Sequence, residues 1–91
     1  MDAKLRYASA FLKHYKKRIT PSVALQKKVQ ERMIMLTINP RHPLLHDHPL
    51  KGDQSGRRSF SITGDIRVIY RIVDETIELL DIGTHNQVYT Q

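Results

Sequence analysis

The sequence predicts an α+β fold in which an N-terminal helical hairpin packs on one face of a small, mostly antiparallel four-stranded sheet. Two observations lead to this class. In the first forty residues the apolar side chains recur every three or four positions, which is the period of a helix that buries one face. In the last third they follow the two-residue period and the Ile and Val richness of strands. With 91 residues, the chain is expected to form one domain, residues 1–91, around one core.

The helical half is expected to follow a short first strand at residues 5–8 (LRYA). Ser9 is expected to cap the first helix. Thr20 and Pro21 are expected to start the second, with Thr20 as its cap and Pro21 at its first position. This helix should end near Asn39, because the proline that follows disfavours helical backbone there. So short a connection predicts an antiparallel hairpin.

The second half is expected to be a long loop and an antiparallel meander. Prolines and glycines interrupt residues 40–57, which predicts the loop. The strands are expected in RRSFSI, IRVIYRIV and TIELLDIG, joined by turns at residues 63–65 and 74–75. In the middle strand Val68 and Tyr70 lie on the more apolar face, which should meet the helices. Arg67 and Arg71 are therefore expected on the open face.

Composition excludes several classes of protein. The chain has no Cys, which excludes disulfides and thiolate metal sites. No apolar run approaches the roughly 18 residues of a membrane span, and the first residues lack a signal-peptide pattern. We therefore expect a cytoplasmic protein that has no membrane partner and no small-molecule cofactor.

The positive charge lies mainly in the first half. The net charge is +6, and residues 3–41 carry ten Lys and Arg against one acid, whereas residues 42–91 carry five against seven. A basic half is typical of proteins that bind a polyanion, most often nucleic acid. A solvated basic helix face gives the same pattern, so charge alone leaves both interpretations open.

Three histidines lie close together in RHPLLHDHPLKG, residues 41–52. They are His42, His46 and His48, with Asp47 between the last two. A closed zinc site needs four ligands in a tetrahedral array, and the prolines here favour diverging side chains. We therefore predict no metal site. His42 and His46 are interpreted as loop residues, and Asp47 as a residue that shapes the loop.

Two motifs carry a family resemblance. The first is Asp47-His48-Pro49-Leu50 with Gly52, Gly56 and Arg58 at set offsets. The second is Gly83-Thr84-His85 with an aromatic residue, Tyr89, four positions after the histidine. Together they resemble the RelE-type toxins of bacterial toxin–antitoxin modules, and the YafQ branch most of all. The resemblance covers residues 47–89 by motif and the whole chain by element order.

The resemblance implies a RelE-like fold and a toxin that cuts messenger RNA in the ribosomal A site until a cognate antitoxin neutralises it. By position it implies catalytic roles for His48, Asp65 and His85, and a substrate contact for Tyr89. Arg67 departs from the YafQ branch but resembles an arginine at the same strand position of the RelE branch proper.

A second departure concerns Ser61, which stands where the closest relatives carry a further histidine. A neutral hydroxyl is not a strong base near pH 7. Part of the expected catalytic set is therefore missing, which puts the rate of cleavage in question.

The chemistry agrees with these residue types. RNA can be cleaved by its own 2′-hydroxyl when a base removes that proton, an acid protonates the 5′-oxygen, and cations stabilise the phosphorane. The hypothesis is His48 or Asp65 as base and His85 as acid, and the reverse assignment stays open. The predicted catalytic residues are His48, Asp65, His85 and Arg67, and the predicted substrate-binding residues are Lys51, Arg58 and Tyr89, of which Lys51 and Arg58 hold phosphate and Tyr89 stacks on a base.

Two other functions remain possible at this stage. A ParE-type toxin would share the fold but bind DNA gyrase, and it would need no such acid–base groups. An inactive relative, kept as a binding module, is the interpretation that Ser61 favours. The expected protein partner is a cognate antitoxin, and an inactive relative would be kept for its antitoxin or for DNA autoregulation. In the nuclease the basic helices are expected to dock on ribosomal RNA.

Overall fold

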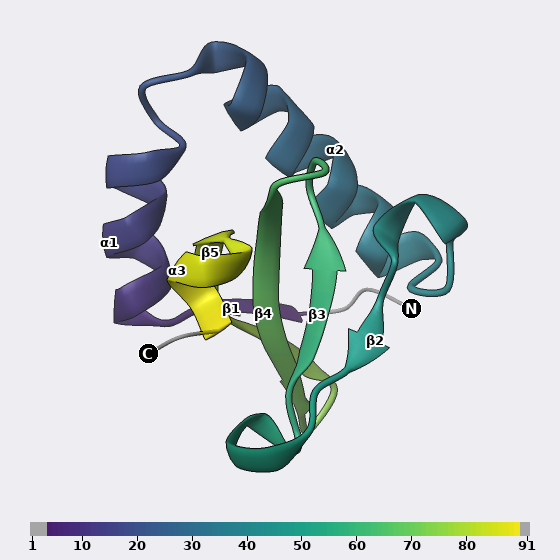
Figure 1. The fold of residues 1–91 in the computed structure, drawn as a ribbon. Coiled ribbons are helices and arrows are strands. Elements are labelled where there is room, and N and C mark those ends of the chain that lie inside the picture. The colour runs from purple at the N-terminus through teal and green to yellow at the C-terminus, as the bar shows by residue number, and fades with distance from the viewer. Residues whose placement is uncertain (1–3, 90–91) are drawn as a thin grey trace.

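The computed structural model describes residues 4–89, and its helices and strands follow the predicted order (Figure 1). The strands are β1 (Lys4–Tyr7), β2 (His48–Pro49), β3 (Arg58–Ser61), β4 (Ile66–Val73) and β5 (Thr76–Thr84). The helices are α1 (Ser9–Arg18), α2 (Val23–Ile38) and α3 (His85–Tyr89), and two single 3-10 turns, η1 (Pro43–Leu45) and η2 (Gly52–Gln54), lie in the loop between α2 and β3.

The sheet is mixed and mostly antiparallel, as predicted. Its strand order is β1-β5-β4-β3-β2, with β1 parallel to β5 and each other pair antiparallel. The sequence predicted four of these strands. The fifth, β2, is a two-residue strand from the loop, in which His48 pairs with Ser59 and Pro49 with Arg58. This pairing attaches the histidine-rich loop to the edge of the sheet.

The core lies between the helices and one face of the sheet. Phe11 of α1 and Val29 and Leu36 of α2 are buried against Phe60 of β3 and Tyr70 of β4. Burial of a large apolar side chain contributes about 1.5–3 kcal/mol, so these contacts hold both helices to the sheet. In Figure 1 the two helices diverge from their connection. A groove of about 610 Å³ lies between them, and its lining includes Leu12 and Ile34.

Both helices begin differently from the sequence-based expectation. Ala8, not Ser9, is the N-cap of α1, and it makes no side-chain cap bond. The α2 helix begins at Val23, and its cap is Ser22, whose Oγ accepts from the amide of Leu25 at 3.2 Å. Pro21 lies before the helix. Ser22, two residues after Thr20, therefore takes the capping role predicted for Thr20, because its oxygen reaches an otherwise unpaired amide.

The second face of the sheet is not fully open. The short helix α3 packs across β4 and β5 and buries Val88. Ile69, on the face predicted to be open, is 2% exposed, whereas Ile72, on the face predicted to be covered, is 61% exposed. The α3 helix therefore covers part of this face. Within residues 4–89, no helix is both long and apolar enough to cross a membrane.

Candidate active site

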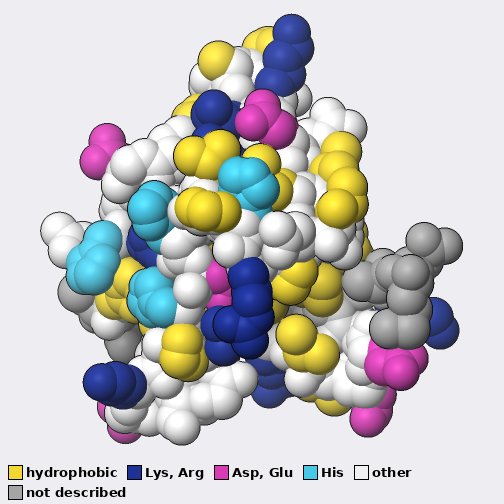
Figure 2. All heavy atoms as spheres, turned by 90° about the vertical axis from the view of Figure 1, so that its right-hand side faces the viewer, with side chains coloured by type: hydrophobic (Ala, Val, Ile, Leu, Met, Phe, Trp, Pro, Cys, Tyr) yellow, Lys and Arg dark blue, Asp and Glu magenta, His cyan; other side chains and the backbone are white. Residues whose placement is uncertain are grey.

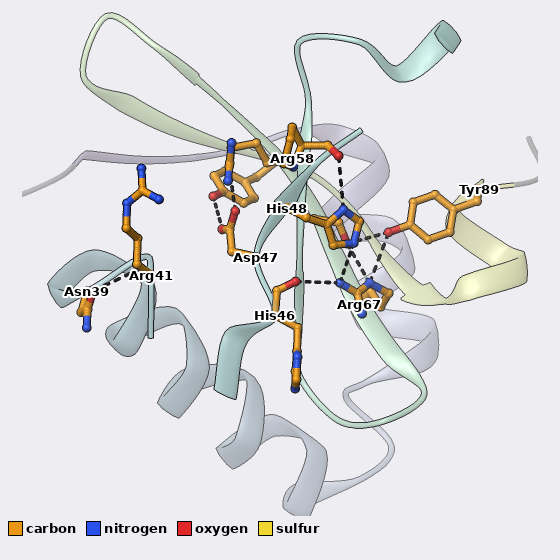
Figure 3. Close-up of polar contacts among 11 residues, drawn as sticks. Asn39, Arg41, His46, Asp47, His48, Arg58, Arg67 and Tyr89 are labelled. Atoms are coloured by element: carbon orange, nitrogen blue, oxygen red, sulfur yellow. Dashed lines mark hydrogen bonds and ion pairs between the residues drawn. The ribbon is translucent and has the colours of Figure 1, made fainter. Parts of the chain in front are cut away.

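Arg67, on β4, lies at the centre of a polar cluster beside α3 (Figure 3). Its Nε donates to Ser59 Oγ at 2.8 Å, and its Nη1 donates to Ser61 Oγ at 2.9 Å. Its Nη2 lies 3.3 Å from the carbonyl oxygen of His46 and 3.3 Å from Nε2 of His48. The pairing of Ser61 with Arg67 across β3 and β4 brings these groups together. The guanidinium is thus held by partners on two strands and the loop.

The hydroxyl of Tyr89 joins this cluster from α3. It donates to Ser59 Oγ at 2.6 Å, and it accepts from Arg67 Nε at 3.2 Å. Figure 3 shows the ring of Tyr89 approaching from the opposite side to His46. A positively charged guanidinium and a phenol are therefore placed side by side, close to the sheet surface. Arg67 and Tyr89 were predicted from the sequence, whereas the two serines that orient Arg67 were not.

His48 contacts the same guanidinium in a defined orientation. Its Nδ1 lies 3.2 Å from the carbonyl oxygen of Pro49, which can only accept, so Nδ1 carries the proton of this hydrogen bond. In the neutral ring Nε2 is then an acceptor, and it faces Nη2 of Arg67 at 3.3 Å. The side chain is solvent exposed at the sheet edge. This arrangement points the acceptor nitrogen of the neutral ring at the guanidinium of Arg67.

His85 reaches the cluster through Tyr89. The centroids of the two rings are 4.4 Å apart at an angle of 60°, an edge-to-face contact. Both residues belong to α3, which the sequence analysis did not predict. Thr84 and Gln87 cap this helix reciprocally, because the amide of Thr84 donates to Gln87 Oε1 at 2.8 Å and the amide of Gln87 donates to Thr84 Oγ1 at 3.3 Å. The pattern Thr-x-x-Gln was the signal that could have predicted α3.

Asp47 anchors the loop that carries His48. Its side chain is only 4% exposed, and it accepts from Nε of Arg58 at 2.7 Å and from the hydroxyl of Tyr70. Burial, and then the hydrogen bond to Asp47, raise the pKa of Tyr70 far above its ordinary value. Asp47 therefore shapes the loop, in agreement with the prediction for it.

Three other predicted site residues are not partners of Arg67 in the hydrogen bonds of the described residues. Arg58 holds Asp47, so its guanidinium already has one partner within the protein. Asp65 is exposed after the β3–β4 turn, where its amide donates to Thr63 Oγ1 at 3.2 Å. Lys51 is exposed just before η2. Among the hydrogen bonds and ion pairs of the described residues, no contact joins the side chain of Asp65 or Lys51 to Arg67.

The surroundings of the cluster are rich in histidine and cationic side chains. Figure 2 shows several histidines gathered near Lys and Arg side chains on the face that carries β2 and the loop before it. In the part of the chain that the structure describes, no three His, Cys, Asp or Glu side chains are arranged to hold a metal ion. The face thus offers proton-transfer groups and positive charge.

Comparison with models of known protein families identifies one family. A family model described as the bacterial toxin of type II toxin–antitoxin system, YafQ, matches residues 3–90. A search of curated protein sequences finds no match to the chain.

Solved structures of similar fold come from several bacteria. The chain is similar to YafQ from E. coli, with 23% identity over 97% of this chain and 99% of that chain and a TM-score of 0.80. It is also similar to a copper-bound mutant toxin from Helicobacter pylori, with 25% identity over 96% and 99% and a TM-score of 0.77. The E. coli DinJ–YafQ toxin–antitoxin complex matches at 22% identity over 98% and 99%, with a TM-score of 0.79.

The RelE-like fold and the family match therefore agree with the resemblance carried by the DHPL and GTH motifs. The chain belongs to the YafQ family of bacterial toxins of type II toxin–antitoxin systems.

Proposed function

We propose that the protein is a ribosome-dependent endoribonuclease that cuts messenger RNA, with its active site around Arg67. The observation that carries the proposal is the contact between Arg67 and the acceptor nitrogen of His48, beside the hydroxyl of Tyr89. A base, a cation and an aromatic ring lie together on an accessible face of the sheet. A protein that only binds a partner needs no such arrangement.

In the proposed reaction the 2′-hydroxyl of the RNA attacks the adjacent phosphorus. His48 Nε2 takes the proton of the hydroxyl, the P–O5′ bond breaks, and the 5′-oxygen leaves with a proton from a general acid. The products are a 2′,3′-cyclic phosphate and a 5′-hydroxyl. Arg67 stabilises the charge on the phosphorane, together with Lys51, which follows His48 by three residues in the same loop. The nucleophile belongs to the substrate, so the step needs no metal-bound water.

The remaining roles follow from position. His85 is the proposed acid, because its ring lies on the edge of Tyr89. His48 is favoured over Asp65 as base, because His48 contacts Arg67 and Asp65 lies at the turn. Tyr89 is proposed to contact a base with its ring while its hydroxyl orients Arg67. Arg58 is proposed to contact RNA phosphate with the guanidinium nitrogens that face away from Asp47.

The first test is cleavage of a defined messenger RNA by the purified protein, with and without translating ribosomes. His48→Gln and His85→Ala are compared with wild type. We expect cuts that need ribosomes and that fall by at least about 10²-fold in both variants, since positioned acid–base groups contribute about 10²–10⁴-fold. Asp53→Asn, a change at an exposed position of the same loop, serves as the control. Equal cutting by wild type and His85→Ala would remove His85 from the mechanism.

Assays with the same purified protein distinguish the ParE-type alternative from the inactive binding module. A gyrase-binding toxin would inhibit supercoiling by DNA gyrase and leave translated message intact. An inactive module would do neither and would still bind its protein partner. Failure to cut, together with inhibition of gyrase, would replace the nuclease proposal with the first alternative.

The proposed protein partner is an antitoxin encoded in the neighbouring reading frame, by analogy with DinJ in the E. coli complex. The basic surface of α1 and α2 favours an acidic segment in that partner. Coexpression with the neighbouring frame tests this: the partner should copurify and abolish cleavage. A neighbouring protein that neither binds nor protects the message would contradict it.

A further inference from the structure

A polar pocket lies beside the proposed active site. It has a volume of about 240 Å³, and its lining residues come from the segment after α2 and from β3: Pro40, Arg41, His42, Pro43, His46, Asp47 and Arg58. None of the proposed catalytic residues lines it. The pocket therefore needs an explanation of its own.

Arg41 and His42 offer hydrogen-bond donors to this pocket. The exposed Arg41 guanidinium makes no hydrogen bond or ion pair with any other residue in the described range, although its amide donates to Asn39 Oδ1 at 3.2 Å. Figure 3 shows this side chain extending beside the Asp47–Arg58 pair. His42 Nδ1 accepts from the amide of Leu44 at 3.1 Å, so the proton of the neutral ring lies on Nε2.

The charge of the pocket favours an anion. Its one carboxylate, Asp47, is paired with Arg58 at 2.7 Å and also accepts from Tyr70. Arg41 then leaves a positive charge in excess, even when His42 and His46 are neutral. The fork of an arginine matches the oxygens of a phosphate group, and Arg41 and Arg58 both line the pocket.

His46 connects this pocket to the active site. Its backbone φ is +46°, a left-handed conformation that costs a residue with a Cβ about 1–2 kcal/mol. In this conformation its carbonyl oxygen meets Nη2 of Arg67 at 3.3 Å while the residue also lines the pocket. The same short segment thus borders both the proposed cleavage site and the pocket.

We propose that this pocket binds a backbone phosphate of RNA, at a position flanking the scissile phosphate. The inference rests on the proposed function, because it places the substrate strand across the Arg67 cluster. Arg41 and the Nε2–H of His42 hold the phosphate, and Arg58 supports it while holding Asp47. The phosphate belongs either to the messenger strand or to ribosomal RNA at the docking surface.

Two probes test the pocket without requiring cleavage. The first is inorganic phosphate, added to the isotope-labelled protein while the side-chain signals of Arg41 and His42 are followed by NMR. The second is a short RNA with 2′-O-methyl groups, which cannot be cut. Its affinity is measured across a range of salt concentrations for wild type, Arg41→Gln and Lys4→Gln. Lys4 is exposed on β1, at the edge of the sheet opposite β2, and provides a control with the same loss of charge.

The expected results are specific to Arg41. Phosphate should shift the signals of the pocket residues saturably. Arg41→Gln should weaken binding of the modified RNA about three- to tenfold and lower the salt slope by about 0.7, the value for one phosphate contact on a single strand. Lys4→Gln should change the affinity and the salt slope less. If Arg41→Gln instead weakens only binding to ribosomes, the phosphate is that of ribosomal RNA.

Two results would contradict the proposal that the pocket binds phosphate. One is that the changes in the NMR signals on addition of phosphate do not saturate or are not confined to pocket residues. The other is an Arg41→Gln variant whose affinities for the modified RNA and for ribosomes both equal those of Lys4→Gln. The nuclease proposal is tested separately, because the wild-type protein can cut RNA even if the pocket binds no phosphate. Conversely, if the protein does not cut RNA, the phosphate titration still shows whether the pocket binds phosphate.

Discussion

Arg67 explains why serine is suitable at position 61. The sequence suggested that Ser61 leaves the catalytic set incomplete. In the structure its buried hydroxyl accepts from Arg67 Nη1 at 2.9 Å, while Ser59 accepts from Nε at 2.8 Å. The two hydroxyls hold the guanidinium, and its Nη2 lies 3.3 Å from Nε2 of His48. At the position where a further histidine was expected, the proposed site thus has a serine that orients a cation.

Replacement of Arg67 by lysine is predicted to lower ribosome-dependent cleavage by about 10²-fold or more. A lysine keeps the charge but cannot contact Ser59, Ser61 and His48 at once, and loss of one preorganised donor costs about 10²–10³-fold. The measurement is the single-turnover rate on translated message. Arg71→Lys is the control on the same strand, since Arg71 is exposed and pairs with Glu78 at 2.6 Å. Equal rates for the two variants would contradict the assignment.

Tyr70→Phe is predicted to destabilise the protein by about 1–3 kcal/mol at pH 7, because it removes a donor from the buried carboxylate of Asp47. The measurement is the free energy of unfolding in urea. Arg58 still pairs with Asp47 in this variant, so the β2 edge should stay attached.

The same substitution should change the dependence of stability on pH. Burial, and then Asp47, raise the pKa of Tyr70 in the folded state, so the folded protein keeps a proton that the unfolded chain releases above about pH 10. The contribution of Tyr70 to stability is therefore complete below that pH and declines above it. Wild type should lose stability there more steeply than Tyr70→Phe. Parallel pH profiles would show that Tyr70 titrates normally.

At the scale of elements, the α3 helix depends on a close approach between β5 and α1. The guanidinium of Arg18, in the last turn of α1, donates to the carbonyl of Ile82 at 2.8 Å. A Cβ on Gly83 would lie 2.6 Å from Arg18 Nη1 and 2.6 Å from Gln87 Oε1. Gln87 is the residue that caps α3 through Thr84. Glycine at position 83 therefore leaves room for both side chains at the start of α3.

Gly83→Ala is predicted to cost about 1–3 kcal/mol of stability through overpacking and to lower the cleavage rate. The rate should fall because a displaced Gln87 releases α3, which carries His85 and Tyr89. Gly64→Ala is the matched control: a Cβ there meets no atom within 4 Å, and the change should stay within about 0.5 kcal/mol of wild type. The measurements are urea unfolding and single-turnover cleavage. A Gly83→Ala protein as stable and active as Gly64→Ala would refute this account.

At the scale of the whole molecule, positive charge and the proposed chemistry occupy different elements. Lys13, Lys16 and Lys17 of α1 and Lys27 of α2 are exposed. Arg18 is already engaged, with Ile82 and with Asp81 at 3.8 Å. The exposed lysines are thus free to contact a polyanion, whereas Arg18 contributes to the fold. Charge counted along the sequence cannot make this distinction.

Binding to ribosomes is predicted to weaken steeply as salt concentration rises, because neutralised phosphates release counterions. Combined replacement of Lys13, Lys16 and Lys17 by glutamine should lower the slope of log affinity against log salt by up to about 2. Sedimentation with ribosomes across a salt series gives this slope. An affinity that does not change with salt would show that contacts other than phosphate dominate.

The sequence alone determined the fold class, the meander of β3, β4 and β5, and the family, because periodicity, turns and short motifs are local properties. Only the tertiary structure decided how the site residues combine. The β2 edge strand, the two serines on Arg67, and the pairing of Asp47 with Tyr70 join segments far apart in the chain. Burial and cross-strand register create these contacts, and no spacing along the sequence encodes them. For the same reason the pocket beside Arg41 emerged only once the loop was placed against β3.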